Sequence, residues 1–211
     1  MRSFSLRQHP RTQAVRRFQW LALAGMALLL LLILALEHPY LNALDLAMSQ
    51  ALYSGPVRLS QILAALMSFA GSLLLALVLA AYFWRSDRLA AIGLPLSVGA
   101  CWALAAAIKY TVQRPRPEIL HLAHASSPSF PSGHSMAAWT LSMGLAFIFA
   151  QRYPERQSLF YILALLFALV CGLSRVALGV HYFSDVLAGF AAATLIVAVF
   201  VMRYAKSRRD F

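Results

Sequence analysis

Long apolar runs dominate the pattern of this chain. Six of them approach or exceed the roughly 20 helical residues that cross about 30 Å of hydrocarbon. An open strand edge would leave backbone groups unpaired in lipid, so each run should be helical. The runs lie near Phe18–Leu36, Leu59–Trp84, Leu89–Ile108, Gly133–Ala150, Leu159–Leu173 and Val186–Met202, with the fifth extending towards Ala177. The pattern predicts an all-α integral membrane protein with six transmembrane helices.

A shorter amphipathic segment joins the first two runs. Leu41, Leu44, Met48 and Leu52 recur at helical spacing, with polar residues elsewhere on the wheel. This spacing predicts a short helix on the outer leaflet of the membrane. Two roles stay open for it: a plain connection between two spans, and the wall of a lateral entrance for a lipid.

The longest connection, Tyr110–Ser132, joins the third and fourth runs. Its prolines exclude a continuous helix there; they are Pro115, Pro117, Pro128 and Pro131. A long structured loop in a compact protein is more often functional than idle. We expect its two histidines, His121 and His124, to be solvated, with contact to a lipid headgroup or a role in a lid as the alternative.

Composition excludes an ordinary soluble domain, since 61% of the 211 residues are hydrophobic and 12% are charged. Cys101 and Cys171 fall inside predicted spans, so we expect apolar packing for both instead of a disulfide or metal site. The basic start of the chain resembles a signal peptide, but Ala35-Leu36-Glu37 is not a small-x-small cleavage site. We therefore expect a retained first helix and a single domain over residues 1–211.

The net charge of +11 is unevenly distributed. Most of the cations lie in the tails 1–17 and 203–211 and in two short loops, which share one side of the membrane if six spans alternate. The positive-inside rule makes that side cytoplasmic, together with both termini. Such basic segments anchor the topology and contact anionic lipid, so no nucleic-acid partner is expected.

Three polar clusters within residues 109–185 lie at the edges of apolar runs, and in the six-span topology all three reach the outer, periplasmic face. They are Lys109 to Pro117 (KYTVQRPRP), Pro131 to His134 (PSGH) and Ser174 to Asp185 (SRVALGVHYFSD). Ionisable groups at membrane depth are functional candidates by default. The clusters hold the residue types needed to bind, attack and protonate a phosphate ester.

Three cations of these clusters are candidate phosphate ligands: Lys109, Arg116 and Arg175. Arginine binds phosphate oxygens through paired hydrogen bonds, and lysine binds them as a point charge. Anchoring at the level of the lipid headgroups is the alternative for each cation taken alone. Arg114 offers a second arginine–proline pair two residues early and is a possible further phosphate contact.

The second cluster has the pattern of a helix start. Ser132 can cap the helix, and Gly133 lets an anion approach free backbone amides. His134 would then be placed to protonate a departing oxygen. An ordinary helix cap with an interfacial histidine is the alternative.

The third cluster pairs His181 with Asp185, four residues apart. A carboxylate on one imidazole nitrogen fixes the tautomer and leaves the other nitrogen free as a nucleophile or base. Arg175 reaches the same place if the chain turns at Gly179. Taken alone, such a pair is more often structural.

Taken together, the three clusters resemble the motifs of the type 2 phosphatidic acid phosphatase (PAP2) family of membrane phosphatases. The matching stretches are Lys-x6-Arg-Pro, Pro-Ser-Gly-His and Ser-Arg-x5-His-x3-Asp, in this order. The resemblance implies that His181 attacks phosphorus to form a phosphohistidine, that Asp185 supports it, and that His134 protonates the leaving group. It implies that the phosphate oxygens are held by Lys109, Arg116, Ser132, Gly133 and Arg175. No metal or other cofactor is implied.

The expected function is hydrolysis of a lipid phosphate or diphosphate at the outer face of a bacterial inner membrane. Expected substrate classes are undecaprenyl diphosphate, phosphatidylglycerol phosphate and phosphatidic acid. A phosphotransferase using the same intermediate stays open as an alternative. An anion transporter is disfavoured, since the spans lack paired broken helices, and a six-span chain fits poorly with a soluble vanadium haloperoxidase.

Overall fold

The structure is a computed structural model that describes residues 10–207, with side chains from Val15 onward. Within that range the chain forms helices and no strand, which confirms the all-α class. The helices are α1 (Pro10–Leu34), α2 (Pro39–Leu52), α3 (Val57–Leu66), α4 (Phe69–Phe83), α5 (Arg88–Val112), α6 (Gly133–Arg152), the short 3-10 turn η1 (Pro154–Arg156), α7 (Gln157–Ala177) and α8 (Phe183–Ser207). The predicted tails 1–17 and 203–211 lie partly outside the described residues.

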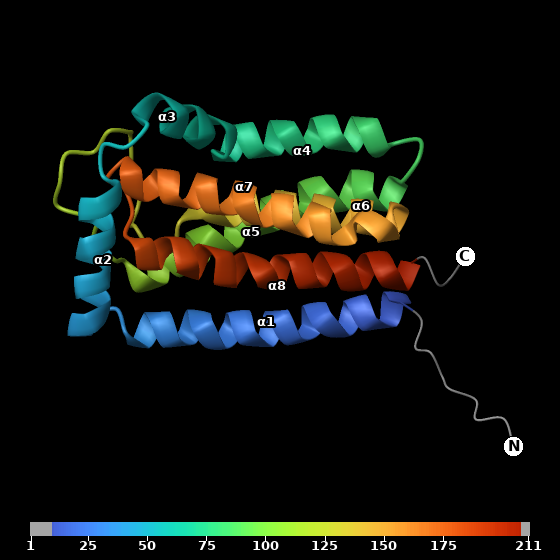
Figure 1. The fold of residues 1–211 in the computed structure, drawn as a ribbon, viewed down its shortest axis with the longest axis horizontal. Coiled ribbons are helices and arrows are strands. Elements are labelled where there is room, and N and C mark those ends of the chain that lie inside the picture. The colour runs from blue at the N-terminus through green and yellow to red at the C-terminus, as the bar shows by residue number, and fades with distance from the viewer. Residues whose placement is uncertain (1–9, 208–211) are drawn as a thin grey trace, which may run out of the picture.

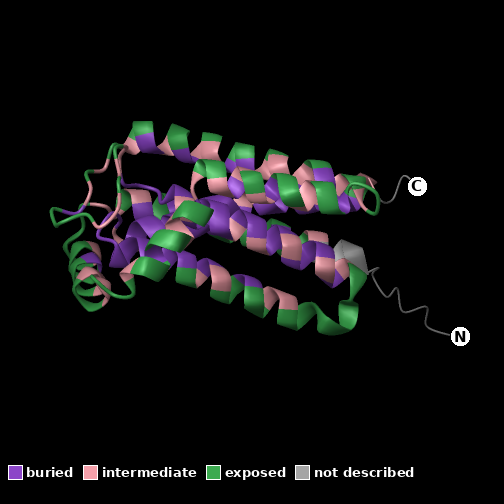
Figure 2. Cartoon of the chain, turned by 90° about the horizontal axis from the view of Figure 1, so that it is seen from above, coloured by how far each residue is buried: buried purple, intermediate pink, exposed green. Residues whose placement is uncertain are grey.

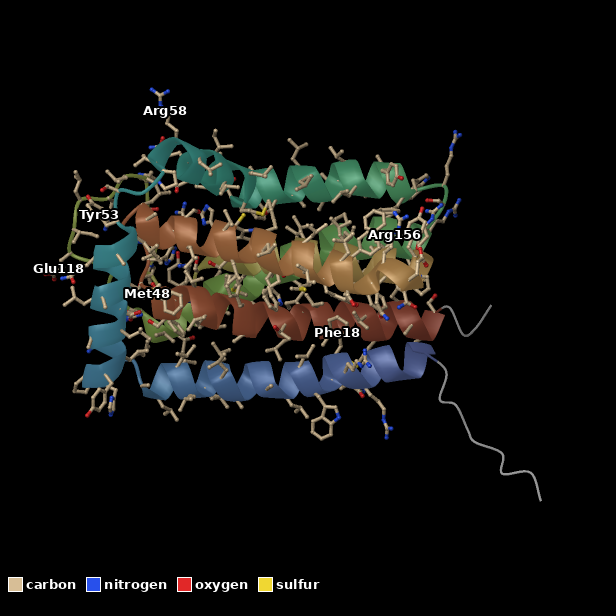
Figure 3. All side chains as sticks on the ribbon, viewed as in Figure 1. Phe18, Met48, Tyr53, Arg58, Glu118 and Arg156 are labelled. Atoms are coloured by element: carbon tan, nitrogen blue, oxygen red, sulfur yellow. The ribbon has the colours of Figure 1, made fainter. Side chains whose placement is uncertain are left out.

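The long helices lie side by side, and α2 crosses one end of the bundle (Figure 1). We call this end, where α5 and α7 finish and α6 and α8 begin, the α2 end. Met48, Tyr53 and Glu118 lie there, whereas Arg156 lies near the other end (Figure 3). The predicted amphipathic segment is therefore a helix, α2, and α7 extends to Ala177 as expected.

Within the described residues, four helices are long and apolar enough to cross a membrane: α1 from Val15, α5, α7 with η1, and α8. A single helix over Leu59–Trp84 was a wrong prediction, because α3 and α4 meet at an angle of 61°. Ser68 causes a fresh helix start, since its side chain accepts a hydrogen bond from Gly71 N at 3.1 Å and caps α4. The bent pair can serve as a fifth crossing.

Helix α6 does not pass the same test for a span, and its position explains why. It packs against α5, α7 and α8, and buried residues are concentrated toward the middle of the bundle (Figure 2). Met136, Leu141 and Phe147 on α6 are almost fully buried. A helix that is surrounded by protein does not need a uniformly apolar surface. Cys101 and Cys171 are buried in the same apolar packing, as predicted.

Candidate active site

His181 and Asp185 meet at the start of α8. His181 lies just before the helix and Asp185 in its first turn, with 3.3 Å between Nδ1 of the histidine and Oδ2 of the carboxylate. The backbone N–H of Tyr182 donates to the same oxygen at 3.0 Å. Asp185 is fully buried and His181 is 2% exposed. The carboxylate thus holds one imidazole nitrogen and leaves Nε2 for chemistry.

The turn that brings Arg175 to this pair is at Gly179. Its φ of +71° is in the left-handed region that favours glycine. Arg175, in the last turn of α7, is only 3% exposed, and its Nε and Nη1 atoms have no hydrogen-bond partner among residues 10–207. A buried guanidinium without partners is unusual, because such donors are nearly always satisfied.

Two more cations come from α5 and the loop after it. Arg116 places Nη1 3.4 Å from Nε2 of His181, while its Nε donates to Ser127 O at 2.8 Å. Lys109, buried at the end of α5, donates to the backbone carbonyls of Pro128 and, at 3.3 Å, Ser129. The proline-rich loop is therefore held against the site by the same side chains that were predicted to bind phosphate.

The Pro-Ser-Gly-His segment starts α6 as predicted. Ser132 caps the helix, its side chain accepting from Ser135 N at 3.4 Å. The Ser132 N–H donates to the backbone oxygen of Asp185 at 3.0 Å, which joins the starts of α6 and α8. A Cβ on Gly133 would lie 2.7 Å from the Trp102 ring, so packing also requires glycine here.

His134 follows on the same helix turn. Its ring stands edge-on to Trp102, with 5.7 Å between the ring centroids. The charges of Arg175, Lys109 and Arg116, and the imidazole of His181, all lie within electrostatic range of it. The structure therefore gathers the predicted residues of all three clusters at the α2 end of the bundle.

Arg114 has different partners from Arg116. Its Nη1 donates to Oδ1 of Asp185 at 2.7 Å and its Nη2 to Oδ2 of Asp45 at 2.8 Å. Its guanidinium also lies 4.0 Å from the centroid of the Tyr182 ring. Sequence reasoning missed Asp45, because an aspartate on the polar side of an amphipathic helix gives no signal of burial.

Burial lowers the pKa of His181 well below its ordinary value of 6.5, and the neighbouring charges of Arg116, Lys109 and Arg175 act in the same direction. The imidazole is therefore neutral at pH 7. Since Nδ1 lies against a carboxylate, the proton belongs on Nδ1 and the lone pair on Nε2. This is the tautomer that a nucleophilic histidine requires.

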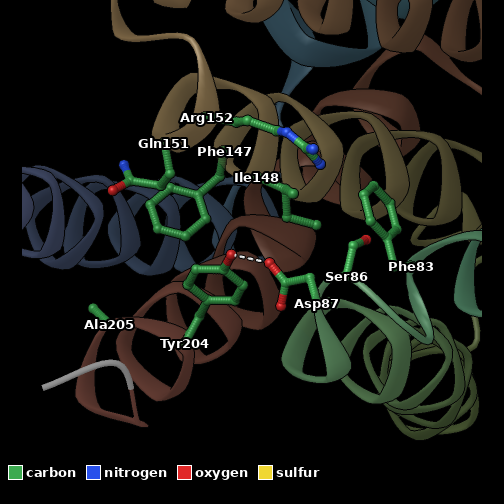
Figure 4. Close-up of a pocket in the computed structure, with 9 residues that line it drawn as sticks. All are labelled: Phe83, Ser86, Asp87, Phe147, Ile148, Gln151, Arg152, Tyr204 and Ala205. Atoms are coloured by element: carbon green, nitrogen blue, oxygen red, sulfur yellow. Dashed lines mark hydrogen bonds between the residues drawn. The ribbon is translucent and has the colours of Figure 1, made fainter. Parts of the chain in front are cut away.

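Neither the loop histidines nor the far end of the bundle adds to the site. His121 and His124 are exposed, as predicted. In the described part of the chain no group of three or more His, Cys, Asp or Glu side chains is arranged to hold a metal ion. A cavity of about 200 Å³ at the opposite end, where Tyr204 bonds to Asp87, contains no residue of the three clusters (Figure 4).

Comparison with known proteins shows which family the chain resembles. Residues 90–209, more than half of the chain, match the model of the PAP2 superfamily. The chain is 40% identical over 92 residues to phosphatidylglycerophosphatase B of Bacillus subtilis (strain 168), a match that covers 42% of this chain and 45% of that relative. The chain thus matches less than half the length of this curated relative.

Two solved structures resemble the whole fold. A transmembrane PAP2-type phosphatidylglycerolphosphate phosphatase from Bacillus subtilis superposes with a TM-score of 0.78 at 29% identity, covering 88% of this chain and 96% of that one. Aquifex aeolicus LpxE superposes with a TM-score of 0.60 at 23% identity, covering 76% and 93%. The first likeness identifies the bundle as a transmembrane PAP2 fold, and the second concerns the fold alone.

Proposed function

The chain belongs to the PAP2 superfamily, and from this premise we propose that it is a membrane phosphatase that hydrolyses a lipid phosphate through a phosphohistidine. The observation that carries the proposal is the buried guanidinium of Arg175, whose Nε and Nη1 have no partner among the described residues. Together with Arg116 and Lys109 it supplies fixed positive charge beside a neutral histidine. A phosphoryl group is a ligand that satisfies such donors.

The proposed reaction has two steps. First, Nε2 of His181 attacks phosphorus, a P–N bond forms, and the P–O bond to the lipid breaks as His134 donates a proton to the leaving oxygen. Then water attacks the phosphohistidine, transfers a proton to His134, and the P–N bond breaks to release inorganic phosphate. Asp185 stabilises the positive charge on His181 in the first step.

In this proposal the phosphate oxygens are bound by Lys109, Arg116 and Arg175 and by the start of α6 at Ser132 and Gly133. Donors that are fixed before the reaction stabilise charge that develops in the transition state. The geometry favours Arg116 over Arg114 as a phosphate ligand, since Arg114 is already bonded to two carboxylates. No metal takes part in this scheme.

A lipid substrate suits the apolar surroundings of the site. A groove of about 870 Å³ runs along α1, α6, α7 and α8, with Trp139, Leu187 and Phe190 among its apolar lining residues. Leu187, two residues after Asp185 and at the start of the second turn of α8, is the lining residue nearest to that carboxylate in sequence. Acyl chains are ligands that such a lining accepts. Phosphatidylglycerophosphate is the first substrate to test, because the similar Bacillus subtilis proteins carry that name.

We further propose six crossings, with α3 and α4 counted as one bent span and α6 as a buried one. Both termini then lie in the cytoplasm and the site faces the outside of a bacterial inner membrane. A reporter fused after Phe211 should be cytoplasmic. An outward location for that reporter would contradict this topology.

The experiment is phosphate release from a panel of lipid phosphates and diphosphates by detergent-purified protein in the presence of a chelator. We expect activity that vanadate blocks, that His181→Ala abolishes and that the exposed control His124→Ala leaves unchanged. Strict dependence on a divalent cation, or activity in His181→Ala, would contradict the mechanism. Transfer of phosphate to an added alcohol in place of water would favour the phosphotransferase alternative.

A further inference from the structure

Asp45 is the one buried residue of α2. The helix lies across the α2 end of the bundle, and its apolar residues Tyr40, Leu44 and Leu46 are exposed. Asp45 is only 1% exposed. An aspartate is almost never fully buried unless it is paired. A carboxylate is buried at this cost only where strong partners compensate it.

The partners of Asp45 lead to the proposed nucleophile. Oδ1 accepts from Ser184 N at 2.8 Å, and Oδ2 accepts from Ser184 Oγ at 2.6 Å and from Arg114 Nη2 at 2.8 Å. Arg114 then donates through Nη1 to Asp185 at 2.7 Å, and Asp185 holds Nδ1 of His181. One chain of charged contacts thus runs from α2 to the imidazole.

We propose that Asp45 is a positioning residue for the reaction, acting on His181 through Arg114 and Asp185. The inference rests on the function proposed above. The guanidinium of Arg114 bonds to two carboxylates, so its positive charge is shared between Asp45 and Asp185. The negative charge of Asp185 is then only partly neutralised by Arg114 and can stabilise a positive charge on the imidazole. Without Asp45, Arg114 would draw Asp185 more strongly to itself and weaken the support of the positive charge that forms on His181.

The geometry of Arg114 explains why the loss of Asp45 should affect Asp185. Its two terminal nitrogens are directed to different carboxylates, each at hydrogen-bond distance. Removal of one partner from a buried charged network leaves the others unbalanced and costs more than the pair contributes. Asp45 therefore influences the rate of phosphoryl transfer without contact with phosphate.

The test compares Asp45→Asn with Glu37→Gln, an exposed acid just before α2 that loses the same charge. We expect kcat for the lipid phosphate to fall about 10- to 100-fold in Asp45→Asn, because the support of the positive charge on His181 in the transition state is weakened. KM and the inhibition constant of inorganic phosphate should stay within about twofold, because the phosphate ligands are intact. Glu37→Gln should match wild type.

A double-mutant cycle separates positioning from general support of the fold. If Asp45 acts through Arg114, the double variant Asp45→Asn with Arg114→Gln should be within about threefold of Arg114→Gln alone. Additive losses would overturn the inference, as would wild-type kcat in Asp45→Asn. Where Asp45→Asn does not fold, Ser184→Ala removes one donor to Asp45 and should lower kcat in the same way; no change there also overturns it.

Failure of this inference differs visibly from failure of the proposed function. An active wild type with an unaffected Asp45→Asn overturns the role of Asp45 alone. A wild type that releases no phosphate from any lipid phosphate overturns the proposed function, and the role of Asp45 with it.

Discussion

Replacement of Arg175 by methionine should stabilise the protein and abolish its activity. Arg175 is 3% exposed, and two of its donor nitrogens have no partner among residues 10–207. A buried unsatisfied donor costs about 1–3 kcal/mol, so the two together cost about 2–6 kcal/mol in the absence of a bound anion. Methionine occupies a similar volume and has no hydrogen-bond donors to satisfy. We therefore expect Arg175→Met to raise the free energy of unfolding by at least about 2 kcal/mol.

The assay is thermal unfolding of detergent-purified protein, followed by tryptophan fluorescence, in phosphate-free buffer and with increasing inorganic phosphate. A gain of 2 kcal/mol corresponds to roughly 4–8 °C in Tm for a chain of this size. Wild type should be stabilised further by phosphate, because the ligand binds only the native state. In phosphate-free buffer the Tm of Arg175→Met should be higher than that of wild type, and added phosphate should not change it. The rate of phosphate release from the lipid phosphate should be at least about 100-fold lower than that of wild type.

The matched control is Arg58→Met, which removes an exposed arginine that projects outward from α3 (Figure 3). It should change neither Tm nor the response to phosphate. If Arg175→Met lowers Tm in phosphate-free buffer, or if phosphate still stabilises it, the reasoning from unsatisfied donors is refuted.

Four further predictions concern the same site. Asp185→Asn should lower kcat about 10³- to 10⁴-fold, measured by phosphate release, because an amide next to Nδ1 favours the wrong tautomer of the imidazole; a loss below tenfold would contradict this. Since burial and nearby cations hold the pKa of His181 well below 6.5, kcat/KM should not fall through protonation of His181 between pH 7 and about 6. Below about pH 6.5 the imidazole of His181 binds a proton in the unfolded chain but not in the native protein. The free energy of unfolding should therefore decrease as the pH is lowered below about 6.5, and it should decrease less in His181→Ala. Gly133→Ala should destabilise by about 1–3 kcal/mol in thermal unfolding through the clash with Trp102, whereas Gly99→Ala, with open space around it, should be neutral or stabilising; equal effects would refute the packing argument.

The apolar runs predicted the helices well because a single apolar segment in a bilayer satisfies all of its backbone hydrogen bonds internally only as a helix. The failure at Leu59–Trp84 has a local cause, since hydropathy does not distinguish one helix from two that meet at a capping serine. His181 and Asp185 were predicted as partners one helical turn apart, and they are in contact although α8 begins between them. Spacing was sufficient here because the contact is local.

Residue types and their order along the chain were readable without coordinates: an all-α membrane fold, three cations, two histidines and one carboxylate near the same end. Two features depended on the tertiary structure. Arg114 bonds to carboxylates whereas two donors of Arg175 have no partner in the described part of the chain, and Asp45 is buried. The physical reason is that hydrogen-bond satisfaction depends on neighbours distant in sequence, such as the 69 and 71 positions that separate Arg114 from Asp45 and Asp185. Local periodicity carries no information about such partners.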